Sequence, residues 1–168
     1  MNSVSYQIIK GHYGDRVAER SQVPLMNHID EGLVILGKLG ASEHTKDAYC
    51  LHPIFQSSDD FRKHRKGEYE GVPAQVIILA MEYRRVANSY LSKGKRSRVS
   101  SFLGFSCPEI KQMLIADKVQ NYRDFMEHHH GVHGKSDELQ EYFTNWFKLL
   151  AIGYEKWKDV ILIQTIKK

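Results

Sequence analysis

The strongest constraint on the fold is a run of apolar residues at helical spacing that begins at Pro108 and extends to about His128. Proline suits the first turn of a helix, where an N–H would have no acceptor within the helix. One face of this predicted helix carries Ile110, Met113, Leu114, Asp117 and Asn121. A carboxylate on an apolar face is costly unless it is paired with a cation or holds a metal. Asp117 is therefore either a buried acid in an ion pair with a Lys or Arg, or a metal ligand.

Similar periodicity along the rest of the chain predicts an all-α bundle of six or seven helices in a single domain, residues 1–168. The predicted helices span residues 5–19, 24–39, 42–53, 72–91, 108–128, 136–153 and 154–166. Ser42 is the expected N-cap of the third helix, and Pro53 is expected to end or kink it. Residues 57–66 are predicted to form an exposed loop or a short surface helix. In the last segment, residues 160–163 are also compatible with a strand.

Composition narrows the class of protein. The chain has 168 residues, 42% of them hydrophobic, which is enough for one core. No apolar run approaches the roughly 18–20 residues of a membrane span, and the N-terminus lacks the pattern of a signal peptide. Cys50 and Cys107 have no metal-binding or disulfide spacing, so a reducing cytoplasm is the expected compartment. The net charge of +4 suits a polyanionic small molecule as well as nucleic acid, and no feature specifies an oligomeric state.

Two other predicted helices each place one histidine on an apolar face. These are His28, in the segment 24–39, and His52, at the end of the segment 42–53. With Asp117 they form a His/His/Asp set, which is a normal group of ligands for Mn²⁺, Fe²⁺ or Zn²⁺. Taken singly, a histidine on an apolar face is more often a hydrogen-bonded packing residue. The spacing of the three residues does not specify a metal site without the motifs around them.

The segments around these residues resemble the successive motifs of the HD superfamily. They read Pro-Leu-Met-Asn-His at 24–28, Ala-Tyr-Cys-Leu-His at 48–52, Ala-Asp-Lys-Val-Gln-Asn-Tyr-Arg-Asp at 116–124 and Leu-Gln-Glu-Tyr-Phe at 139–143. Their order and spacing are most similar to those of the SpoT-like and metazoan SpoT-homologue (MESH-type) hydrolases, from about Tyr13 to Tyr154.

The resemblance implies an HD-type helical bundle that binds a divalent metal ion, with Mn²⁺ expected before Fe²⁺ or Zn²⁺. The implied metal ligands are His28, His52 and Asp117. The residues implied in or beside a nucleotide pocket are Lys118, Asn121, Arg123 and Tyr142. The implied activity is metal-dependent removal of the 3′-pyrophosphate from (p)ppGpp or a related nucleotide, assisted by an acidic pair.

The second motif departs from the pattern of these hydrolases. Pro53 stands where they have an aspartate, and Gln56 and Ser57 stand where they have the acidic pair, so no catalytic residue is assigned. Asp59 and Asp60 replace the lost acids only if the following loop folds inward. Two functions follow: a phosphohydrolase that acts on a nucleotide-like phosphorylated small molecule, or an inactive relative that binds a nucleotide or a protein partner through the same cleft.

Three further features admit other functions. The histidines of residues 128–133 form either a transition-metal site or a solvated loop. The basic stretches 62–66 and 93–98 could contact phosphates of a ligand or of RNA. They lack interleaved aromatic residues, so nucleic acid is not the favoured partner. Arg84 or Arg85 either points into the pocket or pairs with a surface acid.

Overall fold

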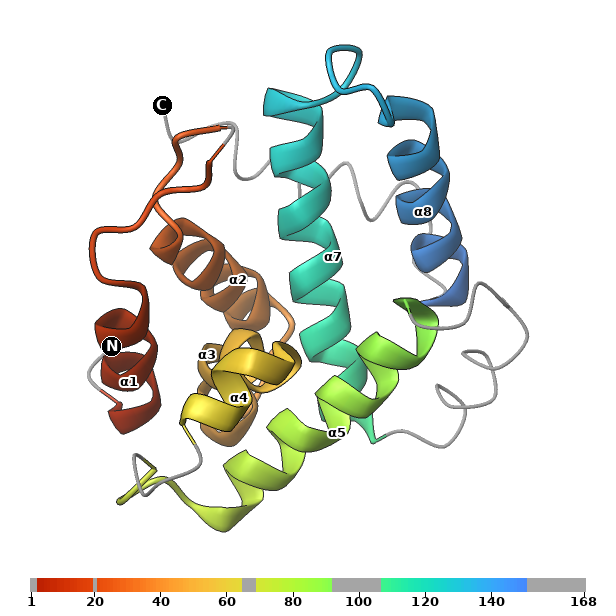
Figure 1. Cartoon of the computed structure of the whole chain (residues 1–168). Coiled ribbons are helices and arrows are strands. Elements are labelled where there is room, and N and C mark those ends of the chain that lie inside the picture. The colour runs from red at the N-terminus through yellow and green to blue at the C-terminus, as the bar shows by residue number, and fades with distance from the viewer. Residues whose placement is uncertain (1–2, 20, 65–68, 92–106, 151–168) are drawn as a thin grey trace.

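The computed structural model describes residues 3–19, 21–64, 69–91 and 107–150 of the 168-residue chain. Within these ranges the backbone forms seven helices and no strand, which confirms the predicted all-α class (Figure 1). The helices are α1 (Val4–Tyr13), α2 (Met26–Lys38), α3 (Glu43–Gln56), α4 (Ser58–Lys63), α5 (Ala74–Leu91), α7 (Pro108–His128) and α8 (Ser136–Leu149). None of the described helices is long and apolar enough to cross a membrane.

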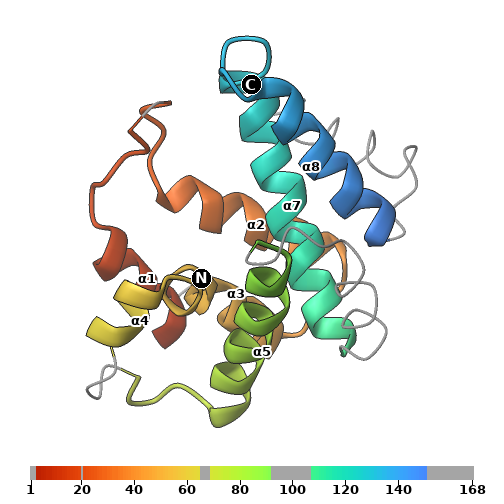
Figure 2. The same ribbon diagram turned by 45° about the vertical axis from the view of Figure 1, so that its right-hand side comes forward.

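Helix α3 lies at the centre of the bundle, and α1, α2, α4, α5 and α7 all contact it (Figures 1 and 2). Helix α7 also contacts α2 and α5, and α8 packs along it on the side away from α2. Three large rings are fully buried in the core: Tyr49 on α3, Tyr83 on α5 and Trp146 on α8. Because α2 and α3 both pack against α7, inward-facing residues of these three helices meet in the interior.

Helix α7 has the bounds that the sequence predicts, from Pro108 to His128. Pro108 lies in its first turn, and the N–H of His129 donates the last helical hydrogen bond to the Phe125 carbonyl at 2.9 Å. Four residues of the predicted apolar face are buried: Ile110, Met113, Leu114 and Asp117. The fifth, Asn121, is half-buried. The carboxylate on the apolar face therefore lies in the interior, as its position in the sequence indicates.

Of the two outcomes expected at Pro53, an end of α3 is wrong, because the helix continues through Pro53 to Gln56. A proline removes one backbone donor, but it does not prevent the residues after it from adopting helical angles. Burial of Ile54 and Phe55 favours one further turn. The Arg84 guanidinium on α5 donates hydrogen bonds to the Phe55 and Gln56 carbonyls, which satisfies acceptors at this helix end. The predicted N-cap is confirmed: the Ser42 hydroxyl accepts from the Thr45 N–H at 3.2 Å.

The first helix is shorter than predicted, because α1 ends at Tyr13 rather than at residue 19. Gly14 follows with a φ of +53°, a left-handed conformation that favours glycine and stops the helix. The connection from Gly14 to α2 is held by an isolated antiparallel bridge between Val17 and Pro24. This connection covers the start of α2 and supplies one wall of the cavity described below.

The segment after α3 forms the short surface helix α4, one of the two forms expected there. Helix α5 confirms the helix predicted at 72–91, and α8 agrees with that predicted at 136–153 as far as Leu149. The predicted final segment 154–166 and the basic stretch 93–98 lie outside the described residues.

Candidate metal centre

The three predicted metal ligands come together inside the bundle. His28 lies in the first turn of α2, His52 in the last turns of α3 and Asp117 in the middle of α7. The two histidine Nε2 atoms lie 3.1 Å apart, and Asp117 Oδ1 lies 3.5 Å from that of His28 and 3.6 Å from that of His52. Among the described residues, this is the only group of three or more His, Cys, Asp or Glu with ligand atoms all within 4.8 Å of one another.

The site is buried on all sides except the one formed by His28. His52 and Asp117 are 2% and 3% exposed, whereas the His28 side chain is 18% exposed. The His52 ring packs between the rings of Tyr49 and Tyr83, with centroid distances of 4.5 and 4.9 Å. These fully buried tyrosines hold the His52 ring in place. Of the three residues, His28 is the one whose side chain is partly exposed to solvent.

Hydrogen bonds determine the tautomer of His28. Its Nδ1 lies 2.6 Å from the Gln120 amide oxygen Oε1. The Gln120 amide nitrogen donates to Asp124 at 2.8 Å and to Glu31 at 3.3 Å, and both of these partners are carboxylates. A carboxylate only accepts, so the amide has one possible orientation and its oxygen must accept from His28. His28 therefore carries its proton on Nδ1, and the Nε2 lone pair points toward His52 and Asp117.

The same assignment holds for His52. Its Nδ1 lies 2.5 Å from the Tyr49 carbonyl oxygen, which accepts and cannot donate. His52 therefore also carries its proton on Nδ1. When both rings are neutral, the two Nε2 atoms therefore face each other at 3.1 Å with a lone pair on each. In this arrangement, a cation between His28 and His52 is stabilised by both lone pairs.

Asp117 uses its two oxygens for different partners. Oδ2 lies 2.5 Å from the Lys118 ammonium, so the buried ion pair considered from the sequence is present. Oδ1 faces the histidines and also accepts from the Asn121 amide at 2.8 Å. Burial acts to raise the pKa of the Asp117 carboxyl and the adjacent Lys118 ammonium acts to lower it, and the resulting pKa is well below its usual range. The carboxylate is therefore ionised and has one oxygen directed at the site.

Lys118 belongs to the interior rather than to the cavity. Its ammonium lies 5.1 Å from the Trp146 ring centroid and 5.8 Å from that of Tyr142, both on α8. Burial acts to lower the pKa of Lys118, and the charge of Asp117 outweighs it and raises that pKa. The pair is thus charged on both sides, and Lys118 neutralises the carboxylate when no metal is bound.

The spacing of the three acceptor atoms fits a single divalent ion. Ligand atoms at about 2.1 Å from Zn²⁺, with angles between about 90° and 109°, lie roughly 3.0–3.4 Å from one another. The separations in this site, 3.1, 3.5 and 3.6 Å, agree with that range to within a few tenths of an ångström. Two neutral imidazoles and one carboxylate oxygen also form a donor set that such ions commonly take. The residues present therefore fit a metal.

A cavity of about 340 Å³ opens onto this cluster. Its polar lining residues are Ser21, His28, His52, Gln56, Asp117, Asn121 and Asp124, and the rest are Tyr13, Ala18, Val23, Pro24, Leu25 and Pro53. The cavity thus has one wall from the connection before α2 and another from α3 and α7. A ligand bound there has both hydrogen-bonding and apolar groups available to it.

Only one of the four residues expected at a nucleotide pocket lines this cavity, namely Asn121. Arg123 lies on α7 in ion pairs with Glu31 at 2.8 Å and Glu127 at 3.8 Å. Lys118 lies behind Asp117, and Tyr142 packs against Lys118. The structure therefore places Lys118, Arg123 and Tyr142 around the cavity rather than on its surface, and their contact with a substrate stays a prediction.

The residues at the positions that depart from the resembled motif lie in different surroundings. Pro53 and Gln56 line the cavity, while the Ser57 hydroxyl accepts from the Asp60 N–H and caps α4. Asp59 pairs with Arg62 on the surface. Asp60 lies 3.9 Å from His12 on α1. Neither aspartate is among the residues that line the cavity, so they do not take the place of the lost acidic pair in this structure.

Asp124 and Gln120 are functional candidates that the sequence motifs did not indicate. Asp124 is the second carboxylate on the cavity wall, and Gln120 links it to His28. The available signal was helical spacing, because Asp124 follows Asp117 by seven residues, two turns of α7. Arg84 and Arg85 belong elsewhere: Arg84 caps the end of α3 and Arg85 pairs with Glu82.

Comparisons of the chain with protein-family models, with curated proteins and with solved structures give no match. The resemblance to HD-superfamily hydrolases therefore rests on the motifs themselves. Independently of that resemblance, the geometry identifies a buried cluster of His28, His52 and Asp117 that opens onto a cavity and is suited to a divalent cation.

Proposed function

We propose that the chain is an HD-type, metal-dependent phosphohydrolase that acts on a phosphorylated nucleotide bound in the cavity. The observation that carries the proposal is the convergence of three acceptor atoms, His28 Nε2, His52 Nε2 and Asp117 Oδ1, at separations of 3.1–3.6 Å. Asp117 Oδ1 has a donor in the Asn121 amide, but three acceptor atoms this close together repel one another unless a cation lies between them. The opening of the cavity onto the cluster allows a phosphate oxygen to reach such a cation.

The cation supplies Lewis acidity and lowers the pKa of water, which is the chemistry that phosphoester hydrolysis needs. Mn²⁺, Fe²⁺ and Zn²⁺ are the candidates. The donor set includes two imidazoles and one carboxylate oxygen, with the second oxygen held by Lys118. Imidazole ligands favour Fe²⁺ and Zn²⁺, while carboxylate-rich sites favour Mn²⁺. The affinities for these three ions therefore need to be compared directly.

The residues of the chain have distinct roles in this proposal. Asn121 holds Asp117 Oδ1 through a hydrogen bond of 2.8 Å, and its position on the cavity wall brings it near a ligand. Gln56 offers an amide that can bind a phosphoryl oxygen but cannot take a proton. Asp124 is the other carboxylate on the wall and is the group able to accept a proton from attacking water.

A second candidate function is an inactive relative that binds a nucleotide, or a protein partner, through the same cavity. The observation in its favour is that Pro53 and Gln56 face the cavity at positions where the resembled hydrolases have acids. Such a site keeps its shape and its hydrogen-bonding groups without the acidic pair. Ligand binding without turnover distinguishes this function from the first.

The first experiment measures bound metal in the purified protein by mass spectrometry, and then the affinity for Mn²⁺, Fe²⁺ and Zn²⁺ by calorimetry. A nucleotide panel that includes ppGpp is assayed with each ion for release of phosphate or pyrophosphate. Asp117→Asn is the test variant, and Asp59→Asn, an exposed acid on α4, is the matched control. Metal binding and turnover that are lost only in Asp117→Asn support the hydrolase. Absence of metal binding contradicts it.

A second experiment restores the resembled motif with Pro53→Asp, Gln56→Glu and Ser57→Asp together. If the restored protein hydrolyses a nucleotide while the original is inert and free of metal, the hydrolase proposal fails and the inactive relative is supported. If the original already binds metal and turns over substrate, Pro53 and Gln56 are compatible with catalysis.

A further inference from the structure

We infer that Pro53 is a positioning residue of the metal site: by lacking an N–H, it leaves the Tyr49 carbonyl free to hold the His52 ring with Nε2 directed at the cation. This inference rests on the proposed metal site and gives the His-Pro sequence a role within it. Pro53 itself does not ligate the metal. It acts on His52 through the backbone of α3.

Helix α3 lacks one backbone donor at residue 53. In an α-helix, each N–H donates to the carbonyl four residues earlier, so the N–H of residue 53 would donate to the carbonyl of Tyr49. Proline has no N–H, and the helix nevertheless continues to Gln56. The Tyr49 carbonyl therefore loses its regular donor in the middle of a helix, where all of Tyr49 is buried. A buried carbonyl in this position requires another donor.

The His52 ring supplies the missing donor. His52 Nδ1 lies 2.5 Å from the Tyr49 carbonyl oxygen. This bond satisfies the carbonyl and places the histidine proton on Nδ1, with the lone pair on Nε2. Ligand histidines in metal sites generally donate their second ring N–H in this way, which sets both tautomer and ring orientation. With an ordinary residue at 53, the regular helical N–H would share the same acceptor and weaken the bond from His52.

His28 shows the same arrangement through a different partner. Its Nδ1 donates to Gln120 Oε1 at 2.6 Å, and the Gln120 amide is held by Asp124 and Glu31. Both ligand rings therefore expose Nε2 to one point, beside Asp117 Oδ1. The chain lacks the aspartate expected after His52, but the proline in its place supports a site with three ligands.

The test compares the wild type with Pro53→Ala, which restores the helical N–H. Pro73→Ala is the matched control, because Pro73 is exposed and lies directly before α5, with no contact to the metal centre among the described interactions. Long-range ¹H–¹⁵N correlation spectra of the metal-free proteins identify the tautomer of each histidine ring. We expect the Nδ1–H tautomer for His52 in wild type and in Pro73→Ala, and a mixture with Nε2–H in Pro53→Ala.

The second readout is metal affinity by calorimetry. Loss of such a supporting hydrogen bond typically weakens binding ten- to a hundredfold, so Pro53→Ala is expected to bind Zn²⁺ about ten- to a hundredfold more weakly than wild type. Visible spectra of the Co²⁺-loaded proteins report any change in coordination. An alanine in a helix is compatible with folding, and far-UV circular dichroism confirms that the variant is folded.

The inference is overturned if His52 keeps the Nδ1–H tautomer in Pro53→Ala, or if wild-type His52 is not in that tautomer. Unchanged Zn²⁺ affinity in Pro53→Ala overturns it as well. The tautomer measurement uses protein without metal, so it tests the role of Pro53 even if wild type binds no divalent ion. In that case the proposed function fails, while the spectra still decide whether Pro53 orients His52.

Discussion

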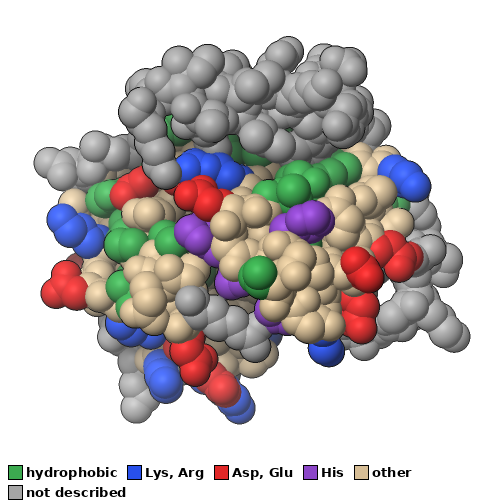
Figure 3. Space-filling view, turned by 90° about the horizontal axis from the view of Figure 1, so that it is seen from above, with side chains coloured by type: hydrophobic (Ala, Val, Ile, Leu, Met, Phe, Trp, Pro, Cys, Tyr) green, Lys and Arg blue, Asp and Glu red, His purple; other side chains and the backbone are tan. Residues whose placement is uncertain are grey.

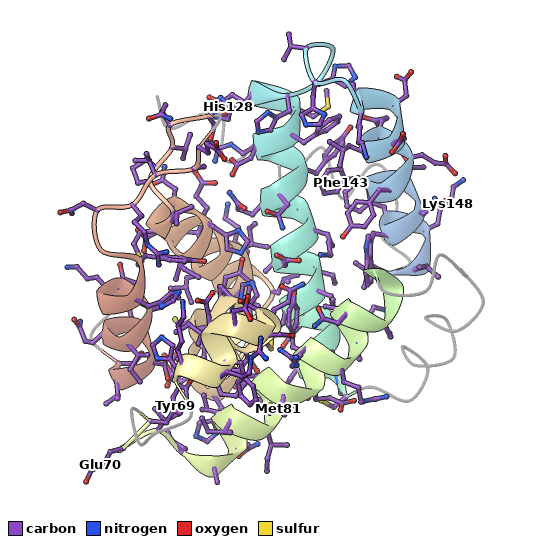
Figure 4. The ribbon with its side chains drawn as sticks, viewed as in Figure 1. Tyr69, Glu70, Met81, His128, Phe143 and Lys148 are labelled. Carbon is purple, nitrogen blue, oxygen red and sulfur yellow. The ribbon has the colours of Figure 1, made fainter. Side chains whose placement is uncertain are left out.

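Two groups of histidines in this protein offer the same ring nitrogens, but one group lies inside the helical bundle and the other lies in a loop. His28 and His52 lie on separate helices, and their Nε2 atoms meet at 3.1 Å beside a buried carboxylate. The second group, the histidine loop, lies at residues 128–133, where α7 ends and the chain turns toward α8. In Figure 4, His128 marks this end of α7, and Figure 3 shows several histidine side chains on the face of the molecule that is seen from above.

The rings of the histidine loop do not converge on one point. The ring centroids of His129 and His133 lie 6.0 Å apart at 81°, and His130 packs edge-on against Phe125. His133 Nδ1 accepts a hydrogen bond from the Lys135 N–H at 3.0 Å, which engages one of its two possible ligand atoms. Within the described residues, the histidine loop supplies no group of three ligand atoms within 4.8 Å.

The contrast shows that histidine density along the chain is a poor guide to a metal site. Neighbouring residues in a turn point in different directions, and their nitrogens take separate partners, as His133 Nδ1 does with the Lys135 N–H. Residues from three packed helices can direct single atoms at one point, with the second nitrogen of each ring fixed by a buried acceptor. Burial strengthens the preference of these atoms for a cation, because it removes the water that would otherwise hydrogen-bond to them.

The largest expected effect is that of Asp117→Ala. The variant removes a proposed metal ligand and leaves Lys118 buried without its carboxylate. Loss of one partner of a buried ion pair typically costs about 3–5 kcal/mol of stability. Urea unfolding measures that cost, and calorimetry measures the loss of metal binding. Asp117→Asn combined with Lys118→Met is expected to recover stability without metal binding. A single Asp117→Ala variant as stable as wild type would show that the pair is not buried as described.

The next effect separates the two histidine groups directly. His28→Asn is expected to weaken divalent-metal binding more than about a hundredfold, beyond the effect typical of residues that only support a ligand. His129→Asn, in the histidine loop, is expected to leave the affinity of the buried site unchanged. Calorimetry with Zn²⁺ and Mn²⁺ on both variants provides the comparison. Equal losses in the two variants, or a loss only in His129→Asn, would move the metal site to the histidine loop.

A third effect tests the packing that holds the buried group. A Cβ on Gly32 of α2 would overlap the ring of Tyr49, which is fully buried beside His52. Overpacking of this kind costs about 1–3 kcal/mol, so Gly32→Ala is expected to lower the free energy of unfolding by that amount. Gly134→Ala, next to His133, meets no atom within 4 Å and is expected to change stability by less than about 0.5 kcal/mol. Thermal and urea unfolding of the two variants measure the difference.

The smallest expected effect is a loss of folding stability as the pH is lowered. Burial is the main cause that lowers the pKa values of His28 and His12 below the usual 6.5. Above that pH both residues are neutral in the folded and unfolded chains. As the pH falls through about 6.5, the unfolded chain takes up protons first, so stability falls until the folded pKa is passed. Urea unfolding of the metal-free protein between about pH 7.5 and 5.5 measures this slope, which is expected to be shallower in His12→Asn. A stability that rises on acidification in this range would contradict the lowered pKa values.

Much of the arrangement was predictable from local pattern. The bounds of α7 follow from Pro108 and from the apolar period, and the Ser42 cap follows from a local hydrogen bond. The positions of His28, His52 and Asp117 on inward faces also follow from helical spacing. In each case the evidence lies within a few residues of the position concerned. The same local reasoning allowed the helix to end at Pro53, which the structure contradicts, because it could not include the support that Arg84 gives from α5.

Other parts of the site depend on residues that are distant in the sequence. The Gln120 amide orients His28 only because Glu31 and Asp124 hold its nitrogen, and Lys118 reaches Asp117 under the rings of α8. No spacing in the chain specifies which charged residues line the cavity and which ones pair elsewhere, as Arg123 does. These outcomes depend on how helices cross and on which side chains fill the space between them.

Local sequence is thus sufficient to specify that three helices each carry one metal-competent residue on an apolar face, because a period of 3.6 residues is a property of each segment alone. The convergence of those residues, the inward direction of both Nε2 atoms and the place of Asp124, rather than Asp59 or Asp60, on the cavity wall are consequences of the packed bundle. The reason is physical: the direction of a side chain on its own helix is set by nearby residues, whereas its distance from another helix is set by the packing of the whole core.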